Sequence, residues 1–401
     1  DIDVRTYQFT RIHGSAAAGD LGIAGVHAIT LTPCPRGLSG ADVNHYVYIS
    51  GGTGTAEAVL ISGGTCTSGA ASGTLSFTTM NAHTGTWRIT SATAGIKEAI
   101  NTLPSNGGTI RLPSAASPYT IYQTIFIGNG STLTVSTMQN VRLEGDGSGT
   151  SADEMPTGSS SGTMLYWGGA VGGTIMDVEG PFAGLRLHGM FYQCQGTTRA
   201  ETGLRMTHTF NSQFSDLEFD GCSGYAIKHY AYSDPPQSVR IGANNNNWDT
   251  ISIYPGSSTS ASGIQIGGTT SGGFNLDVAK NIFRNMNIGA GGATGVALNL
   301  RFTDNLIFET FSVTDGAIGI LVTESISGFP SGITCINCNL TGATTFIDDT
   351  GWIGLGNPGI MFNTYQWDGV DPIGTNGWSS GYDNRGVWWG KWYSTPSAYS
   401  A

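Results

Sequence analysis

Two carboxylates, Glu218 and Asp220, are the residues of this chain whose types and spacing best suit catalysis. They stand two residues apart in QFSDLEFD, so a strand would direct both side chains to one face, roughly 6.6–7 Å apart. An inverting glycosidase needs two carboxylates about 6.5–9.5 Å apart, with room for a water between them. Aligning the repeats of the chain places four more candidate residues on neighbouring strands: Glu144, Arg186, His188 and Tyr254.

We expect Glu218 and Asp220 to act as acid and base, and the other four residues to contact the substrate. Arg186 and His188, one strand away, would adjust the carboxylate pKa values and hold a sugar hydroxyl or a uronate. A lyase would instead use Arg186 or His188 as the base, with a carboxylate-bound cation such as Ca²⁺ neutralising the uronate. Otherwise no cofactor is expected. The same residues could also simply form the cross-strand charge pairs that stabilise any sheet.

These residues belong to a repeat with one apolar spacing. Phe214, Leu217 and Phe219 define it, and the same spacing occurs eight times in all, seven of them from Phe182 onward at intervals of 25 to 35 residues. A fixed apolar pattern with loops of variable length indicates a solenoid, and its period of two indicates strands. We therefore predict a parallel β-helix over residues 95–372. The middle residue of each repeat should form one inward-facing stack: Leu185, Leu217, Ile251, Met286, Phe311, Cys338 and Tyr365.

Composition supports an extracellular all-β protein. The chain has 401 residues, 61 of them glycine, and only 11% are charged. A net charge of −11 argues against nucleic acid and anionic membranes as partners, since both attract basic surfaces. No run of 18 apolar residues is present, so we expect no membrane insertion. The chain begins with Asp1, so any export signal would already be removed. We expect secretion or a place on a virion surface.

Six cysteines fit an oxidising compartment. Two pairs could form disulfides: Cys34 with Cys66, and Cys194 with Cys222. Cys335 and Cys338 occupy inward positions of the repeat, where we expect small buried hydrophobic side chains. Their spacing resembles half a zinc site, but no second Cys or His pair lies nearby in the sequence, so no metal is predicted.

The regions outside the solenoid differ in pattern. Short alternating strands separated by Gly-rich turns predict a β-module over residues 1–94. Apolar residues at helical spacing predict a short helix over 96–103, ended by Pro104, with Ile96, Ile100 and Leu103 buried. Such a helix would cover the open end of the first coil.

The segments GIKEAINTLPSNGGTIRLP, PYTIYQTIFI and NVRLEGDGSGT resemble the entry segment of the pectate-lyase-like β-helix superfamily. That superfamily includes polysaccharide lyases, glycoside hydrolases and phage tailspike depolymerases. The resemblance covers roughly residues 95–370 and implies an all-β fold, a right-handed single-stranded parallel β-helix. The polygalacturonase motifs (Asn-x-Asp, a paired Asp and Gly-His-Gly) are not in their usual arrangement. No catalytic residue can therefore be carried over from the family.

The tail, residues 373–401, is rich in aromatic residues. Six of the nine tryptophans lie from Trp352 onward. They could form a sugar-stacking platform, but a cap on the last coil or a subunit contact is the favoured interpretation. The tail could thus support a homo-oligomer.

The sequence favours an extracellular enzyme that degrades polysaccharide, either a glycoside hydrolase or a lyase. The alternative is a non-catalytic structural or adhesive protein, such as a tail-fibre, tailspike-like or filament subunit. Paired carboxylates in a groove lined by aromatic rings would favour the enzyme. A flat face with its charges paired would favour the structural role.

Overall fold

The structure is a computed structural model. It describes residues 1–13, 21–42, 44–128, 138–148, 162–231, 242–268, 270–271, 274–275, 278–292, 294–301, 303–322, 333–340, 343–348, 360–366, 378–382 and 387–392.

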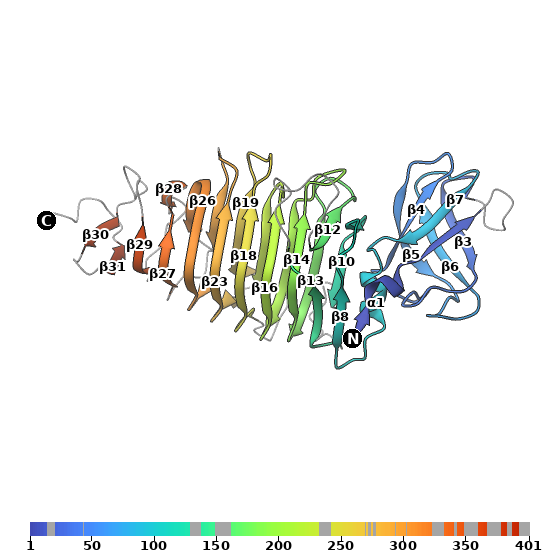
Figure 1. Ribbon diagram of the computed structural model, residues 1–401, viewed down its shortest axis with the longest axis horizontal. Helices are drawn as coiled ribbons and strands as arrows, with labels where there is room; N and C mark the ends of the chain where they lie inside the picture. Colours follow the sequence, from blue (N-terminus) through green and yellow to red (C-terminus); the bar gives the residue numbers. More distant parts are fainter. Residues whose placement is uncertain are drawn as a thin grey trace.

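Parallel strands stack coil upon coil along the long axis of the molecule (Figure 1). The first face of the solenoid consists of β8 (Gly108–Leu112), β11 (Val141–Gly145), β14 (Arg186–Gln193), β16 (Gln213–Asp220), β18 (Asn247–Tyr254), β23 (Ile282–Gly289), β26 (Ile307–Val322), β27 (Ile333–Asn339) and β29 (Ile360–Gln366). The second face consists of β10 (Ile125–Gly128), β13 (Thr174–Ala183), β15 (Thr202–Phe210), β17 (Tyr225–Ala231), β19 (Ser262–Gly268), β24 (Val296–Leu300), the end of β26 and β28 (Ala343–Asp348). The predicted parallel β-helix is confirmed.

Two shorter strands extend the first face at its N-terminal end. Strand β12 (Thr163–Trp167) pairs with the second half of β14, and β9 (Tyr119–Ile121) pairs with β12. Two small pairs lie outside the faces: β20 (Thr270–Ser271) with β21 (Phe274–Asn275), and β22 (Val278–Ala279) with β25 (Thr303–Asp304).

A left-handed residue inside six consecutive strands of the first face, from β14 to β27, explains the apolar spacing. Asp216 has φ 51°, and the equivalent residues of other coils also have positive φ: Gly189, Thr250, Asn285, Thr310 and Asn337. Regular strand places residues i and i+2 on one side. The extra left-handed residue makes Phe214 and Leu217, three apart, both face the interior. Leu217 and Phe219 then follow the ordinary alternation.

The register of one strand differs from the prediction by five residues. Met190, not Leu185, lies opposite Leu217, because Leu187, Met190 and Tyr192 repeat the apolar spacing. Each coil has a second left-handed residue at the corner before the first face, here Gly184 (φ 72°). The predicted register aligns Gly184, at this corner, with Asp216, at the bend inside β16. The residue of β14 that corresponds to Asp216 is Gly189. Leu185 is buried in the core, but outside the predicted stack.

The predicted stack is confirmed for the next five members, which are buried in the solenoid core: Leu217, Ile251, Met286, Phe311 and Cys338. The side chain of Tyr365 lies outside the described part of the structure. Leu217 pairs with Ile251, Ile251 with Met286, and Met286 with Phe311. The backbone of Cys338 pairs with that of Tyr365. Aromatic rings follow one another along the interior. The ring centroids are 4.1 Å apart for Phe214 and Trp248, 5.8 Å for Trp248 and Phe283, and 4.9 Å for Phe283 and Phe308.

The N-terminal module is a separate antiparallel sheet with its own core. Its strands are, in order, β2 (Thr10–His13), β7 (Trp87–Ser91), β4 (Tyr46–Gly51), β5 (Glu57–Gly63), β6 (Gly73–Thr79) and β3 (Gly25–Leu31). The first residues of the chain do not follow the predicted 1–94 boundary. Strand β1 (Ile2–Asp3) pairs in parallel with β8, and Val4 of the 3₁₀ helix η1 (Val4–Tyr7) packs in the solenoid core.

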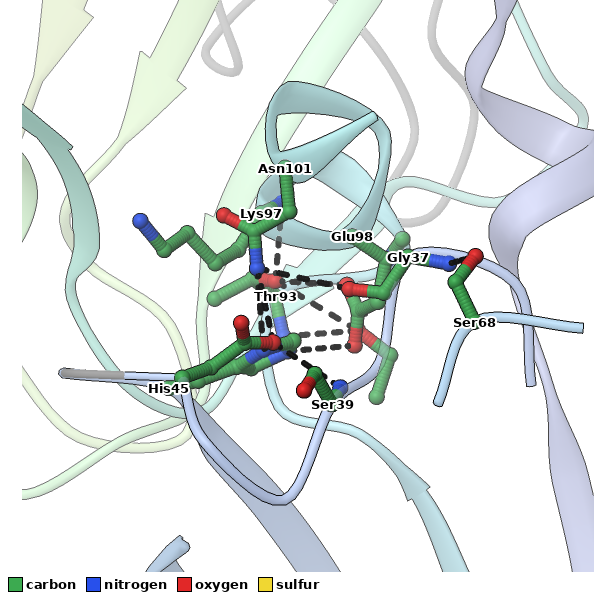
Figure 2. Close-up of polar contacts among 11 residues, drawn as sticks. Gly37, Ser39, His45, Ser68, Thr93, Lys97, Glu98 and Asn101 are labelled. Carbon is green, nitrogen blue, oxygen red and sulfur yellow. Dashed lines mark hydrogen bonds and ion pairs between the residues drawn. The ribbon is translucent and has the colours of Figure 1, made fainter. Parts of the chain in front are cut away.

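Helix α1 (Ile96–Asn101) covers the first coil, and Ile96, Ile100 and Leu103 are buried against it, as predicted. A buried polar cluster joins this helix to the module (Figure 2). The His45 ring lies between two carboxylates, with Nδ1 2.9 Å from Asp42 Oδ2 and Nε2 3.2 Å from Glu98 Oε1. The Ser91 hydroxyl donates a hydrogen bond of 2.8 Å to Glu98. The module is thus attached through charged groups.

Three disulfides are present. Cys34–Cys66 and Cys194–Cys222 are paired as predicted. Cys335 and Cys338 are buried, as predicted, and they are in addition paired with each other, which was not expected. The left-handed residue Asn337 between them directs both side chains inward, where they can meet.

In the tail, β31 (Val387–Trp392) pairs antiparallel with both β29 and β30 (Trp378–Tyr382). The tail therefore adds strands to the last coil, which is the predicted position of a cap. A subunit contact stays a prediction. No helix in the described ranges is long and apolar enough to span a membrane.

Candidate functional site

The register of β14 divides the predicted group of six residues. Arg186 lies opposite Gln213, and His188 lies opposite Ser215. Both are therefore about five residues, or roughly 16 Å, along the strands from Glu218 and Asp220. The predicted contacts of Arg186 with Glu218 and of His188 with Asp220 are wrong, because the corner at Gly184 was aligned with the bend at Asp216.

Arg186 and His188 instead form a separate exposed group. Glu144 of β11 lies opposite His188, as the alignment predicted. The His188 Nδ1 is 3.0 Å from the Ser215 hydroxyl. Glu144 is thus also distant from Asp220, and these three residues do not contribute to a site around the carboxylate pair.

Glu218 and Asp220 lie together on the outer side of β16, because Leu217 and Phe219 face the core. Their exposed fractions are only 6% and 5%, although they point away from the solenoid interior. Phe191 and Ser252 are the neighbours of Glu218 on adjacent strands. Two carboxylates held this far from water on an outer face need a specific reason, and catalytic groups are one such reason.

Asp220 belongs to a row of outward residues at the carboxyl ends of four strands. The row consists of Tyr166 on β12, Gln193 on β14, Asp220 on β16 and Tyr254 on β18. Gln193 Nε2 donates a hydrogen bond of 2.8 Å to Asp220 Oδ2. Both tyrosines are partly exposed. The predicted neighbour Tyr254 is confirmed, and aromatic rings stand on either side of the Gln193–Asp220 pair.

Loops that follow the strands form the rim of this row. Arg199 Nη2 donates a hydrogen bond of 2.7 Å to the Ser257 hydroxyl, which in turn donates one of 3.3 Å to Gln195 Oε1. A Cβ at Gly256 would lie 3.2 Å from Asp220 Oδ1, so a glycine leaves that carboxylate its space. The Cys194–Cys222 disulfide links the residues that follow β14 and β16. Covalent linkage directly behind the row limits its movement.

Sequence reasoning missed Tyr166, Gln193, Gln195, Arg199 and Ser257. A signal for Gln193 was available, because aligning Leu187, Met190 and Tyr192 with the repeat places Gln193 beside Asp220. Tyr166 would have followed from β12, whose short pattern gave no repeat. The loop residues Gln195, Arg199 and Ser257 carry no periodic signal.

A second carboxylate pair lies on the outer side of β13. Asp177 is fully buried, and Arg205 Nε donates a hydrogen bond of 3.0 Å to its Oδ1. Arg205 Nη2 also binds Asp177 Oδ2 and lies 3.9 Å from Glu179 Oε1. Burial and the neighbouring charge of Asp177 raise the pKa of Glu179. Arg205 thus neutralises the buried Asp177, and Glu179 lies at the edge of this ion pair.

The chain matches no protein-family model, and no curated protein is significantly similar to it. The strand pairing shows a parallel β-helix, the fold that the resemblance of the sequence implied. Solved structures with weak similarity include ORF18 of Geobacillus virus E2, at 15% identity and a TM-score of 0.34, covering 69% of this chain and 58% of that one.

Two further solved structures are similar at the same level. A DFA-IIIase from Arthrobacter chlorophenolicus A6 has 13% identity and a TM-score of 0.40, covering 65% of this chain and 57% of that one. An alginate lyase from Paenibacillus sp. str. FPU-7 has 12% identity and a TM-score of 0.37, covering 69% of this chain and 93% of that one. This chain thus spans less than two thirds of the first two proteins. Similarity at this level concerns the fold alone.

In this β-helix, then, the outer face of β12 to β18 combines two carboxylates, an amide, an arginine and two tyrosine rings. Among the described residues, no three His, Cys, Asp or Glu side chains gather as a metal-binding group. The arrangement of the row suits a polar ligand with hydroxyl groups and flat apolar surfaces, since it offers hydrogen-bonding groups between aromatic rings.

Proposed function

We propose that this protein degrades polysaccharide by cleaving glycosidic bonds at the row formed by Tyr166, Gln193, Asp220 and Tyr254. The observation that supports the proposal best is the position of Asp220 between two tyrosines, with Glu218 two residues earlier on the same face. Tyrosine rings stack on pyranose rings, and the amide and carboxylates bind their hydroxyl groups.

Hydrolysis with inversion fits this arrangement better than a lyase reaction. Gln193 donates to Asp220, which favours the ionised carboxylate and suits it to activate water. Glu218 lies beside the apolar ring of Phe191, which favours the protonated acid that must donate to the departing oxygen. The lyase alternative relied on Arg186 or His188 as base, and both lie far from the carboxylates. We further propose that the enzyme acts outside the cell, where its three disulfides would persist.

The test is a cleavage assay on a panel of neutral and acidic polysaccharides. Hydrolysis produces reducing ends alone, whereas a lyase also produces a double bond that absorbs ultraviolet light. Glu218→Gln and Asp220→Asn should each reduce turnover by at least about a hundredfold, the typical contribution of a general acid or base. Unfolding midpoints should change little.

Glu179→Gln is the matched control, because Glu179 belongs to the other carboxylate pair. It should retain normal turnover. If both Glu218→Gln and Asp220→Asn retain activity while Glu179→Gln loses it, the catalytic site lies on the second face instead.

The alternative, a non-catalytic adhesive protein, is supported by a separate observation. The N-terminal module carries five strongly exposed apolar side chains, between 42% and 86% exposed: Ile12, Ile23, Val26, Leu60 and Met80. Exposed apolar side chains of this kind are available for contact with a partner surface. Absence of cleavage across the panel, with retention of the protein on one immobilised polysaccharide, would favour adhesion.

A further inference from the structure

A cavity of about 280 Å³ lies where the N-terminal module meets the start of the solenoid. Its walls come from η1, from the beginning of β2 and from the loop at residues 33–36. The Cys34–Cys66 disulfide holds this loop against the module. The cavity is thus built between parts of the chain that are fixed by covalent and sheet contacts.

Two arginines give the cavity a positive charge. Arg11 and Arg36 both line it, and none of the other described residues in its walls is acidic. The chain as a whole has a net charge of −11, so a positive cavity is unusual for it. Within the described ranges, neither arginine forms an ion pair. An anionic ligand would supply the missing counter-charge.

Arg11 is held in place but not satisfied. Its Nη1 donates a hydrogen bond of 3.1 Å to the Thr10 carbonyl, and its Nη2 lies 3.5 Å from the Pro33 carbonyl. The buried Nε has no acceptor among the described residues. A guanidinium that is positioned by carbonyls and lacks a carboxylate is prepared to bind one, because its donors form a planar fork.

The remaining walls suit a sugar ring. Tyr7 and Phe9 supply aromatic surface. Thr102 beside helix α1 donates a hydrogen bond of 3.1 Å to the Tyr7 hydroxyl and so fixes that ring. The volume equals that of roughly nine water molecules and lies at the lower limit of typical ligand pockets, about 300 Å³. One sugar residue would fit, and a longer segment of chain would not.

We propose that this cavity binds a single acidic sugar residue, a pyranose bearing a carboxylate, of the polysaccharide on which the enzyme acts. The identity of the ligand as a sugar rests on the proposed function. The arginines would bind the carboxylate, and the rings of Tyr7 and Phe9 would contact the pyranose. The N-terminal module would then hold the substrate chain at the end of the solenoid, remote from Asp220.

The test is calorimetric titration of the full chain with a galacturonate trisaccharide at low salt. Every protein in the titration also carries Asp220→Asn, so that the ligand is not cleaved. Arg11→Gln and Arg36→Gln should each weaken binding by about tenfold or more, as expected for loss of a charge-assisted hydrogen bond. Arg88→Gln is the matched control, because Arg88 is an exposed arginine of the same module. It should bind normally.

Two additional ligands separate the alternatives. A neutral galactose trisaccharide should bind at least about tenfold more weakly than the galacturonate form, since it lacks the carboxylate. Inorganic sulfate should compete only weakly, since it cannot contact the aromatic rings. If sulfate binds as well as the acidic sugar, the cavity is a simple anion site and the proposal is overturned.

The two proposals fail separately. Unchanged binding in both arginine variants overturns the cavity proposal, even where Asp220→Asn abolishes cleavage. Loss of binding in those variants supports it, even where Glu218→Gln and Asp220→Asn still cleave the polysaccharide and the catalytic site must be sought elsewhere.

Discussion

Adjacent side chains of β16 meet opposite surroundings. Phe219 is fully buried and its ring centroid is 4.6 Å from that of Tyr192, whereas Glu218 points to the outer side. Strand geometry imposes this difference, since successive side chains leave the sheet in opposite directions. The consequences of a charge are therefore opposite at two positions only one residue apart.

Phe219→Asp should destabilise the protein by more than about 4 kcal/mol, because it buries an unpaired charge and leaves a cavity. Denaturant unfolding followed by circular dichroism measures the loss. Should Phe219→Asp fail to fold, Phe219→Leu provides a measurable loss of about 1–3 kcal/mol. Glu218→Gln is the neighbouring control, and an equal loss in that variant would contradict the assignment of the two faces.

The left-handed residue inside each first-face strand from β14 to β27 sets the register of these strands. Gly189 adopts φ 66° without strain, whereas Thr250 adopts φ 56° despite its β-branched side chain. A Cβ at Gly189 would also lie 2.8 Å from the Gly145 carbonyl oxygen. The same bend is thus tolerated at one position and strained at another.

Gly189→Val should lower stability by about 1–3 kcal/mol, through backbone strain and the contact with Gly145. Thr250→Gly should raise stability or leave it unchanged. Removing the side chain relieves about 1–2 kcal/mol of left-handed strain, and the larger conformational entropy that glycine loses on folding offsets part of this gain. Midpoints of urea unfolding compare the two. Equal effects of both substitutions would show that the bend does not control stability at these sites.

At the scale of the whole molecule, the buried cluster around His45 connects the module to the solenoid (Figure 2). Burial opposes protonation of His45, but the carboxylates of Asp42 and Glu98 outweigh it and raise its pKa above 6.5. Lys97, also buried beside these carboxylates, has its pKa lowered from 10.5 by burial. The cluster thus brings His45 and Lys97 together with the carboxylates of Asp42 and Glu98 in a buried site.

The stabilisation from His45 should be complete below about pH 6.5 and should be lost as the pH rises through the higher pKa of the folded state. Lys97 contributes with the opposite sign, because burial lowers its pKa in the folded state: its destabilising effect is relieved as the pH rises from that lowered pKa towards 10.5. Thermal unfolding of the full chain between about pH 6 and pH 9 measures the effect. His45→Gln should remove the pH dependence in this range, and an unchanged dependence in that variant would contradict the role of His45.

The sequence by itself determined the solenoid, because the apolar spacing of each strand is a local property and is repeated coil after coil. It likewise determined the capping helix and two disulfides. Only the tertiary structure decided which left-handed bend of one coil stacks on which bend of the next coil. The triplets at Phe182 and at Leu187 have identical spacing, and the choice between them depends on contacts with the coils on either side. That choice separated Arg186 and His188 from Glu218 and brought Gln193 and Tyr166 to Asp220. The cavity at Arg11 and Arg36 also depends on the tertiary structure. Both β1 and η1 precede the strands of the module in the sequence, but they pack on the solenoid.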